Sequence, residues 1–271
     1  MIGLLRRLVD PRERLLHTLA RADLPTLPSA HLRVLQALRS DRSLPDVGRE
    51  LALDPALTSA VLRTVNSAAF GLRRKVADAS HAASLLGRAE LETLVLGMGV
   101  VATSPRDPPG LRTEDFWRTS ARRAVTARAL ADHVAPRDRS ACFTAGLLQD
   151  MALPLLCQAR PAVYTELLAS HDHADLAAHE RAALGVDHAE VAGWLAEHWR
   201  FPENLAVALR THHAVGEGPP PVVVAGLLAH NEEDAWIEET ARRVGVGSAI
   251  VAQAIAEGRA LGDDLAAAIL R

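Results

Sequence analysis

The chain has 271 residues, of which 49% are hydrophobic, 23% charged and only 3% aromatic, and its formal net charge is −3. This balance is typical of a folded globular protein and excludes a largely disordered chain. The slightly acidic charge gives no general attraction to nucleic acid or anionic membranes. With so few aromatic residues, Leu, Ala and Val must fill the core, which favours helices.

The N-terminus does not read as a secretory leader, because Arg6 and Arg7 interrupt its apolar run. No segment elsewhere is apolar over the length of a membrane span. Cys142 and Cys157 lie in apolar stretches without Cys-x-x-Cys spacing, as expected of reduced core residues. We therefore expect a cytoplasmic protein with no membrane contact, in which residues 1–20 form a helical extension.

Helical periodicity dominates the sequence, beginning at residues 32–38, where apolar side chains recur every three or four positions. Asp54 is a favoured N-cap and Pro55 suits the first helical position, so a second helix is predicted to begin there. This helix is expected to continue through Asn66 and to end near Gly71, where a glycine allows a left-handed cap.

A third helix is predicted over residues 90–102 and is followed by three prolines and a glycine in residues 104–110. Such residues cannot continue a helix, so this segment reads as a linker between two helical lobes. A second break at residues 216–221 reads as a loop within the second lobe. Because no stretch shows sustained strand alternation, the sequence predicts an all-α fold of two packed helical lobes. The predicted parts are residues 1–20 (extension), 21–104 (first lobe), 105–110 (linker) and 111–271 (second lobe).

Residues 44–63 resemble a DNA-binding helix-turn-helix, with Arg63 on the second helix. A recognition helix must be basic and exposed, whereas this one offers mainly Arg63 and begins at Asp54, where a phosphate would lie. Two packed helices joined by a turn occur in any helical bundle. The basic run at residues 73–75 is typical of a solvated turn. We therefore expect no nucleic-acid partner.

Four short motifs follow one another through the first lobe. They are Leu24-Pro25-Thr26-Leu27-Pro28, Asp54-Pro55-Ala56-Leu57-Thr58, Val65-Asn66-Ser67-Ala68-Ala69-Phe70-Gly71 and Ala82-Ala83-Ser84-Leu85-Leu86-Gly87. In this order they resemble the HDOD domain, the HD-related output domain of bacterial signalling proteins, over roughly residues 20–235. The resemblance implies a helical N-terminal lobe that packs on a lobe like the HD phosphohydrolases.

An HD hydrolase needs imidazoles and carboxylates that converge on one or two metal ions. The resemblance places Thr119 at the first histidine position and Gln149-Asp150 at the His-Asp pair. It also places Leu153 where HD-GYP relatives carry a lysine, and Asn231 at the final acidic position. Because these replacements remove ligands and negative charge, the resemblance implies a degenerate site without a catalytic residue or a bound cofactor.

Other parts of the motif are retained, and they leave four candidate residues for the degenerate metal site: Asp150, His188, His212 and His213. Three imidazoles near one carboxylate are a possible ligand set for zinc, iron or manganese. The same residues can instead form a buried polar network without an ion, in which the carboxylate bonds the histidines directly. The sequence leaves both interpretations open, and also which of His212 and His213 points inward.

We therefore predict a non-catalytic HDOD signalling protein that acts through contact with other signalling proteins. A cleft between the lobes, floored by Asp150, His188 and His212, is the predicted pocket for a small ligand or a partner. The enzyme alternative is a metal-dependent phosphohydrolase or phosphodiesterase with an atypical metal site. The less favoured alternative is a DNA-binding regulator. The pattern predicts no particular oligomeric state.

Overall fold

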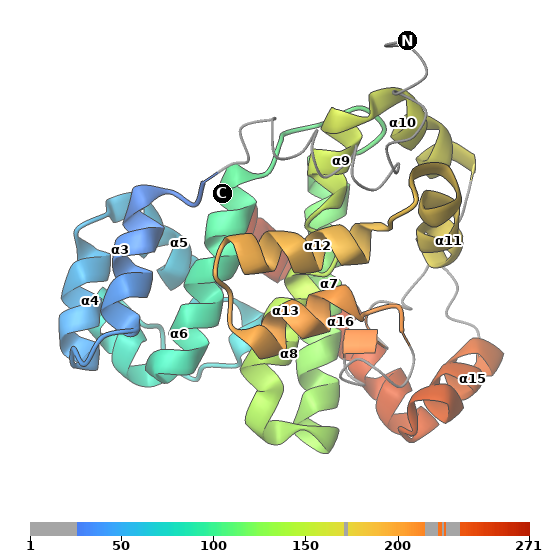
Figure 1. The fold of residues 1–271 in the computed structure, drawn as a ribbon. Helices are drawn as coiled ribbons and strands as arrows, with labels where there is room; N and C mark the ends of the chain where they lie inside the picture. Colours follow the sequence, from blue (N-terminus) through green and yellow to red (C-terminus); the bar gives the residue numbers. More distant parts are fainter. Residues whose placement is uncertain (1–25, 171–172, 215–221, 224, 226–233) are drawn as a thin grey trace, which may run out of the picture.

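The computed structural model describes residues 26–170, 173–214, 222–223, 225 and 234–271 (Figure 1). Within these residues the chain forms α-helices and two short 3₁₀ helices, and no strand occurs among them, so the predicted all-α fold is confirmed. The predicted extension at residues 1–20 and the predicted loop at residues 216–221 lie outside the described part.

In the part of the first lobe that the structure describes, from residue 26 onward, there are five helical elements. They are α3 (Ser29–Leu38), α4 (Leu44–Ala52), α5 (Pro55–Val65), the 3₁₀ helix η1 (Ala68–Phe70) and α6 (Ala79–Thr103). Helix α5 begins as predicted, because the Asp54 side chain accepts a hydrogen bond of 2.8 Å from the backbone N–H of Leu57. Helix α6 is longer than the predicted third helix and is kinked at Gly87, whose φ of 74° suits a glycine.

The end of α5 differs from the prediction, because this helix ends at Val65 and not near Gly71. The helix stops here because the Asn66 side chain hydrogen-bonds the backbone of Val76, ten residues further along the chain. Its Nδ2 donates to the carbonyl of Val76 and its Oδ1 accepts from the N–H of Val76, each at 2.8 Å. The chain then forms η1, and Gly71 closes that element with a left-handed φ of 61°.

The second lobe follows the non-helical residues 104–112. Its elements are α7 (Thr113–Val134), η2 (Pro136–Asp138), α8 (Arg139–Leu148), α9 (Leu153–Ala159), α10 (Pro161–Ser170), α11 (His173–Leu184), α12 (His188–His198), α13 (Glu203–Arg210), α15 (Asp234–Val244) and α16 (Ser248–Leu270). In Figure 1, α7 and α8 stand at the centre of the molecule, with α12 and α13 lying across them. The domain boundaries at the linker stay a prediction.

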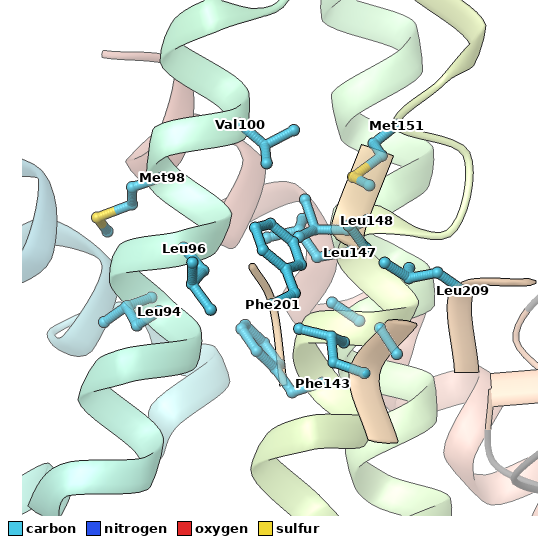
Figure 2. Packing of buried hydrophobic residues seen from close by; sticks show 14 of the residues in the cluster. Leu94, Leu96, Met98, Val100, Phe143, Leu147, Leu148, Met151, Phe201 and Leu209 are labelled. Atoms are coloured by element: carbon cyan, nitrogen blue, oxygen red, sulfur yellow. The ribbon is translucent and has the colours of Figure 1, made fainter. Parts of the chain in front are cut away.

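One continuous apolar core runs through both lobes. Figure 2 shows its middle, where Leu96 and Val100 of α6 face Leu147 of α8 and Phe201. Burial of these side chains removes apolar surface from water, which is the main force that holds the lobes together. The two lobes are therefore packed as parts of one folded body.

The C-terminal helix α16 lies against both lobes. Gly258 and Gly262 face α7 so closely that a Cβ at Gly262 would lie 2.7 Å from the Cα of Arg122. The Arg122 guanidinium also makes two hydrogen bonds with Asp263, of 2.8 and 3.0 Å. On the first lobe, the N–H of Ala68 donates to Asp264 at 2.7 Å. Helix α16 thus joins α7 to the end of the first lobe.

One helical stretch in the described residues, Pro136–Ala159, is long and apolar enough to cross a membrane by length and composition. Its mean hydropathy is 1.3, and 83% of its most apolar window is buried within the fold. Burial to this degree is typical of a core segment of a packed protein. Helix α8, which lies within this stretch, contacts α6 and α7.

Candidate functional site

The site is organised around Asp150, which lies in the turn between α8 and α9 and is 3% exposed. Its neighbour Gln149 forms the C-cap of α8 and is 1% exposed. Neither amide atom of Gln149 has a hydrogen-bond partner, which is a costly state for a buried amide. Of the pair that replaces His-Asp, only Asp150 therefore enters the polar cluster described below.

His188 is the first residue of α12 and is 1% exposed. Asp187 is the N-cap of this helix, since its side chain accepts from the N–H of Glu190 at 2.8 Å. The His188 ring is held by Glu180 of α11, whose Oε2 lies 2.6 Å from Nδ1 and also accepts the His188 backbone N–H at 2.8 Å. Tyr164 of α10 donates to the other Glu180 oxygen at 2.8 Å. This chain of bonds leaves His188 Nε2 directed at Asp150.

His212 and His213 follow the last residue of α13. The Nδ1 of His212 donates to the carbonyl of Leu209 at 2.7 Å, so this imidazole does satisfy the carbonyl end of the helix. Its Nε2 lies 3.3 Å from Asp150 Oδ1 yet makes no hydrogen bond. The Nε2 of His213 lies 2.9 Å from that of His188. Both histidines therefore point inward, with His212 fully buried and His213 partly exposed.

The structure brings all four predicted candidates together: the ligand atoms of Asp150, His188, His212 and His213 lie within 4.8 Å of one another. The Nε2 of His188 is 3.4 Å from Asp150 Oδ1. Ligands on a tetrahedral zinc ion, with bonds of about 2.0–2.1 Å, stand about 3.3 Å apart. The Glu180 carboxylate and a backbone carbonyl fix the two buried rings by their other nitrogens, as partners behind metal ligands do. In type and direction, these donors fit one transition-metal ion.

Arg123 of α7 is a further member of the site, and the sequence did not single it out. Its guanidinium makes a buried ion pair with Asp150 Oδ2, and the arginine side chain is 5% exposed. Helix α8 can approach α7 here because residue 146 is glycine, where a Cβ would lie 2.8 Å from the Arg123 carbonyl. Arg123 stands one helical turn after Thr119, so both lie on one face of α7. That spacing is the signal that could have found it.

Burial and neighbouring charges shift the pKa values of three residues of the site, Asp150, His188 and His213. Burial alone raises the pKa of Asp150, but the Arg123 guanidinium and the adjacent imidazoles outweigh it and hold this pKa well below the ordinary value. Burial lowers the pKa of His188, whereas the carboxylates on its two sides raise it to about 10. Burial and the two neighbouring rings lower the pKa of His213 to about 2. The negative charges of the Asp150 and Glu180 carboxylates are therefore balanced by two positive charges, those of the Arg123 guanidinium and the His188 imidazolium.

The other positions taken from the resemblance do not join this cluster. Thr119 is partly exposed on α7 and offers only a neutral hydroxyl, which is a poor ligand for a transition metal. Leu153 begins α9 and is fully buried in the apolar core. Asn231 lies outside the described residues. The replaced positions that the structure describes thus add no ligand to the four candidates.

A groove of about 1180 Å³ lies between the lobes, bordered by α3, α5, α6, α7 and α16. Its walls include Trp117 and Met98, and its rim carries charged residues of both signs. His31 lines it while only 7% exposed, and His31 Nδ1 has no hydrogen-bond partner. The predicted inter-lobe cleft was to be floored by Asp150, His188 and His212; this groove is lined by none of them.

The helix pair α4 and α5 has the outline of a helix-turn-helix, but its basic residue is engaged elsewhere. Arg63 Nε donates to the carbonyl of Ala268 at 3.2 Å, and Nη1 donates to Ser59 at 2.7 Å. Helix α16 therefore contacts the part of α5 that would have to enter a DNA groove.

Comparison with known proteins agrees with this architecture. The sequence pattern of the HDOD domain matches residues 24–215. The chain belongs to the HDOD domain family. Among curated proteins, an uncharacterized protein of Treponema pallidum is 29% identical over 202 residues, which is 73% of this chain and 39% of that protein. The matched region thus spans well under half the length of this relative.

Solved structures share the HDOD fold over nearly the whole chain. A candidate phosphohydrolase from Shewanella amazonensis superposes with a TM-score of 0.76 at 24% identity, covering 94% of this chain and 97% of the other. An HDOD domain protein of unknown function from Geobacter sulfurreducens gives 0.71 at 22% identity, with 94% and 96% covered. A candidate signal transduction protein from Marinobacter aquaeolei gives 0.71 at 19%, with 96% and 66% covered. These similarities establish the fold.

Proposed function

We propose that this HDOD protein is a non-catalytic cytoplasmic regulator that acts through contact with other signalling proteins. The observation that carries the proposal is the buried ion pair between Arg123 and Asp150. In a hydrolase, the carboxylate at this position would neutralise the metal ion. Here it already neutralises a guanidinium of the same chain.

The charge of Arg123 works against a catalytic metal. A divalent ion about 5 Å from a guanidinium is repelled by about 7 kcal/mol at an effective dielectric constant near 20. A hydrolytic metal also needs an open position for water and substrate, whereas Asp150, His188 and His212 are each at most 3% exposed. Gln149 supplies no further negative charge.

A hydrolysis assay tests the non-catalytic part of the proposal. The full chain and the variant His188→Ala are incubated with bis(4-nitrophenyl) phosphate or a cyclic dinucleotide, in the presence of Mn²⁺, Fe²⁺ or Zn²⁺. We expect the two proteins to give the same background rate with every metal. Hydrolysis by the unaltered protein that is lost in His188→Ala would contradict the proposal.

The second candidate function is that of a metal-dependent phosphohydrolase, and one specific observation favours it. His188 and His212 direct Nε2 at Asp150 Oδ1, and both rings are held from behind by their other nitrogen. His213 lies beside them, with its Nε2 2.9 Å from that of His188. The candidate phosphohydrolase of similar fold makes the same reaction class worth testing. The assay above separates the two candidates, because only the enzyme depends on His188.

The groove between the lobes is the surface through which we propose that the protein contacts its partner. It combines apolar walls with charged residues of both signs at the rim, a composition suited to a segment of another protein. Its walls come from both lobes, so a bound segment would contact α5 and α16 together. A partner of this kind presents apolar side chains flanked by charged ones.

Two matched variants of α16 test this contact. Ala267→Glu places a charge in the groove, whereas Ala256→Glu places the same charge at an exposed position of the same helix. A partner is first captured from native lysate and identified, and its binding is then measured by calorimetry with both proteins purified. We expect Ala267→Glu to weaken binding at least tenfold and Ala256→Glu to leave it unchanged. Equal affinities for both variants would refute the groove as the contact surface.

A further inference from the structure

We propose that Arg123 is a built-in cation that excludes a divalent metal ion from the cluster of Asp150, His188, His212 and His213, and that this cluster is a latent transition-metal site. The inference rests on the proposed non-catalytic function, and it identifies Arg123 as the residue that keeps the site from binding a metal ion. It assigns to Arg123 a positioning role, because the guanidinium acts on the ligand set through Asp150.

The first support is the direction of the ligand atoms. His212 Nε2 is buried and faces Asp150 Oδ1 at 3.3 Å, without the alignment of a full hydrogen bond. A fully buried nitrogen in this state is rare, and its lone pair or N–H is aimed into the cluster. His188 Nε2 lies 3.4 Å from the same oxygen, and His213 Nε2 completes the group. The donors of a one-metal site are therefore already assembled.

The second support is the count of formal charges. A metal ion binds only neutral imidazoles, so His188 must first give up its proton. Asp150, Glu180 and Arg123 then sum to one negative charge, and a divalent ion would bring the buried site to one positive charge. Without the guanidinium, the two carboxylates sum to two negative charges, which the same ion would neutralise. Because uncompensated buried charge is costly, Arg123 sets which of the two states is favoured.

The third support is that Arg123 cannot easily move away. It projects from the middle of α7, its side chain is 5% exposed, and its Nη1 bonds Asp150 directly. The close approach of α8 at Gly146 confines the backbone on which it stands. Solvent therefore screens the guanidinium little, and its charge stays beside the ligand set.

The test compares zinc binding by the unaltered full-length chain, Arg123→Met and Arg123→Lys. All three are purified with chelator, desalted and titrated with Zn²⁺ by calorimetry, and bound zinc is counted by elemental analysis. Arg123→Met removes the charge and keeps the apolar stem, whereas Arg123→Lys keeps a cation. We expect Arg123→Met to bind one zinc ion per chain at least 100-fold more tightly than the other two, and His188→Ala in the same background to abolish that binding.

Two results would overturn the inference. One is a folded Arg123→Met protein that binds zinc no better than the unaltered chain. The other is an unaltered chain that already binds one zinc ion as tightly as Arg123→Met. If the unaltered chain binds zinc tightly but shows no hydrolysis in the assay above, the inference fails and the proposed non-catalytic function still holds. The two are distinguishable because zinc binding and hydrolysis are measured in separate experiments.

A second measurement tests the inference even if Arg123→Met is too unstable for calorimetry. Arg123→Met and its His188→Ala double variant are refolded with zinc or with chelator, and their thermal unfolding is followed by circular dichroism. We expect zinc to raise the midpoint of Arg123→Met and not that of the double variant, because only the former has a complete ligand set. Equal midpoints with and without zinc in Arg123→Met would also overturn the inference.

Discussion

At the scale of single residues, the site could be predicted only in part. The resemblance to the HDOD family identified Asp150 and the three histidines, and the structure groups all four. Arg123 was missed because it precedes its partner by 27 residues, and only the packing of α7 on α8 joins them. Glu180 was missed for the same reason, since it reaches His188 from a different helix.

A double-mutant cycle measures the coupling of Arg123 and Asp150. We expect Arg123→Met and Asp150→Asn each to lower the free energy of unfolding by about 3–5 kcal/mol, since each orphans a buried charge. The double variant should lose less than the sum of the two, because it leaves neither charge alone. Urea unfolding at neutral pH gives the four values, and strict additivity would show that the pair is not coupled.

His31 gives a prediction of pH dependence that is independent of the cluster. Burial lowers the pKa of His31 below 6.5, and Asp54, the acidic group near it, opposes this shift. The unfolded chain therefore takes up the proton at higher pH than the folded chain, so this residue lowers stability as the pH falls below about 6.5. Between about pH 7.5 and about pH 5.5, we expect His31→Gln to lose less stability than the unaltered protein. As a control, His81→Gln, at an exposed position, should lose as much stability over this pH range as the unaltered protein. If His31→Gln also loses as much stability as the unaltered protein, His31 is not the source of the pH dependence.

At the scale of helices, starts were easier to predict than ends. Asp54 caps the helix that follows it, as predicted, because the cap depends only on residues that are neighbours in the sequence. The end of α5 was predicted too late, because it depends on the bond from Asn66 to Val76, ten residues further on. The role of α16 could not be predicted, since its glycines matter only where α7 lies against them.

The close packing of α16 on α7 predicts a strong effect at Gly262. A side chain there meets the backbone of Arg122, so we expect Gly262→Val to lower the free energy of unfolding by about 1–3 kcal/mol or more. Ala260→Val, at an exposed position of the same helix, controls for the lower helix propensity of valine. Chemical denaturation compares the two variants, and equal losses would mean that the contact is not tight.

At the scale of the whole molecule, composition and periodicity were enough to predict the all-α class. The continuous core was not predictable from them, because it depends on how α6 faces α8 across the linker (Figure 2). Such a core, together with α16 on both lobes, favours unfolding as a single unit.

We therefore expect one cooperative transition when the full chain is unfolded in urea. Circular dichroism should report both lobes together. Tryptophan fluorescence should report the second lobe alone, because all four tryptophans, Trp117, Trp194, Trp199 and Trp236, belong to it. Coincident midpoints from the two probes are the expected result. Two separated transitions would show that the lobes fold independently and that the shared core contributes little.

In the working protein, we expect Arg123, and not a metal ion, to compensate the charge of Asp150. Elemental analysis of the protein purified from its native cells, without added metal or chelator, tests this most directly. We expect far less than one transition-metal ion per chain. One iron, zinc or manganese ion per chain that is retained through purification, and lost in His188→Ala, would contradict it.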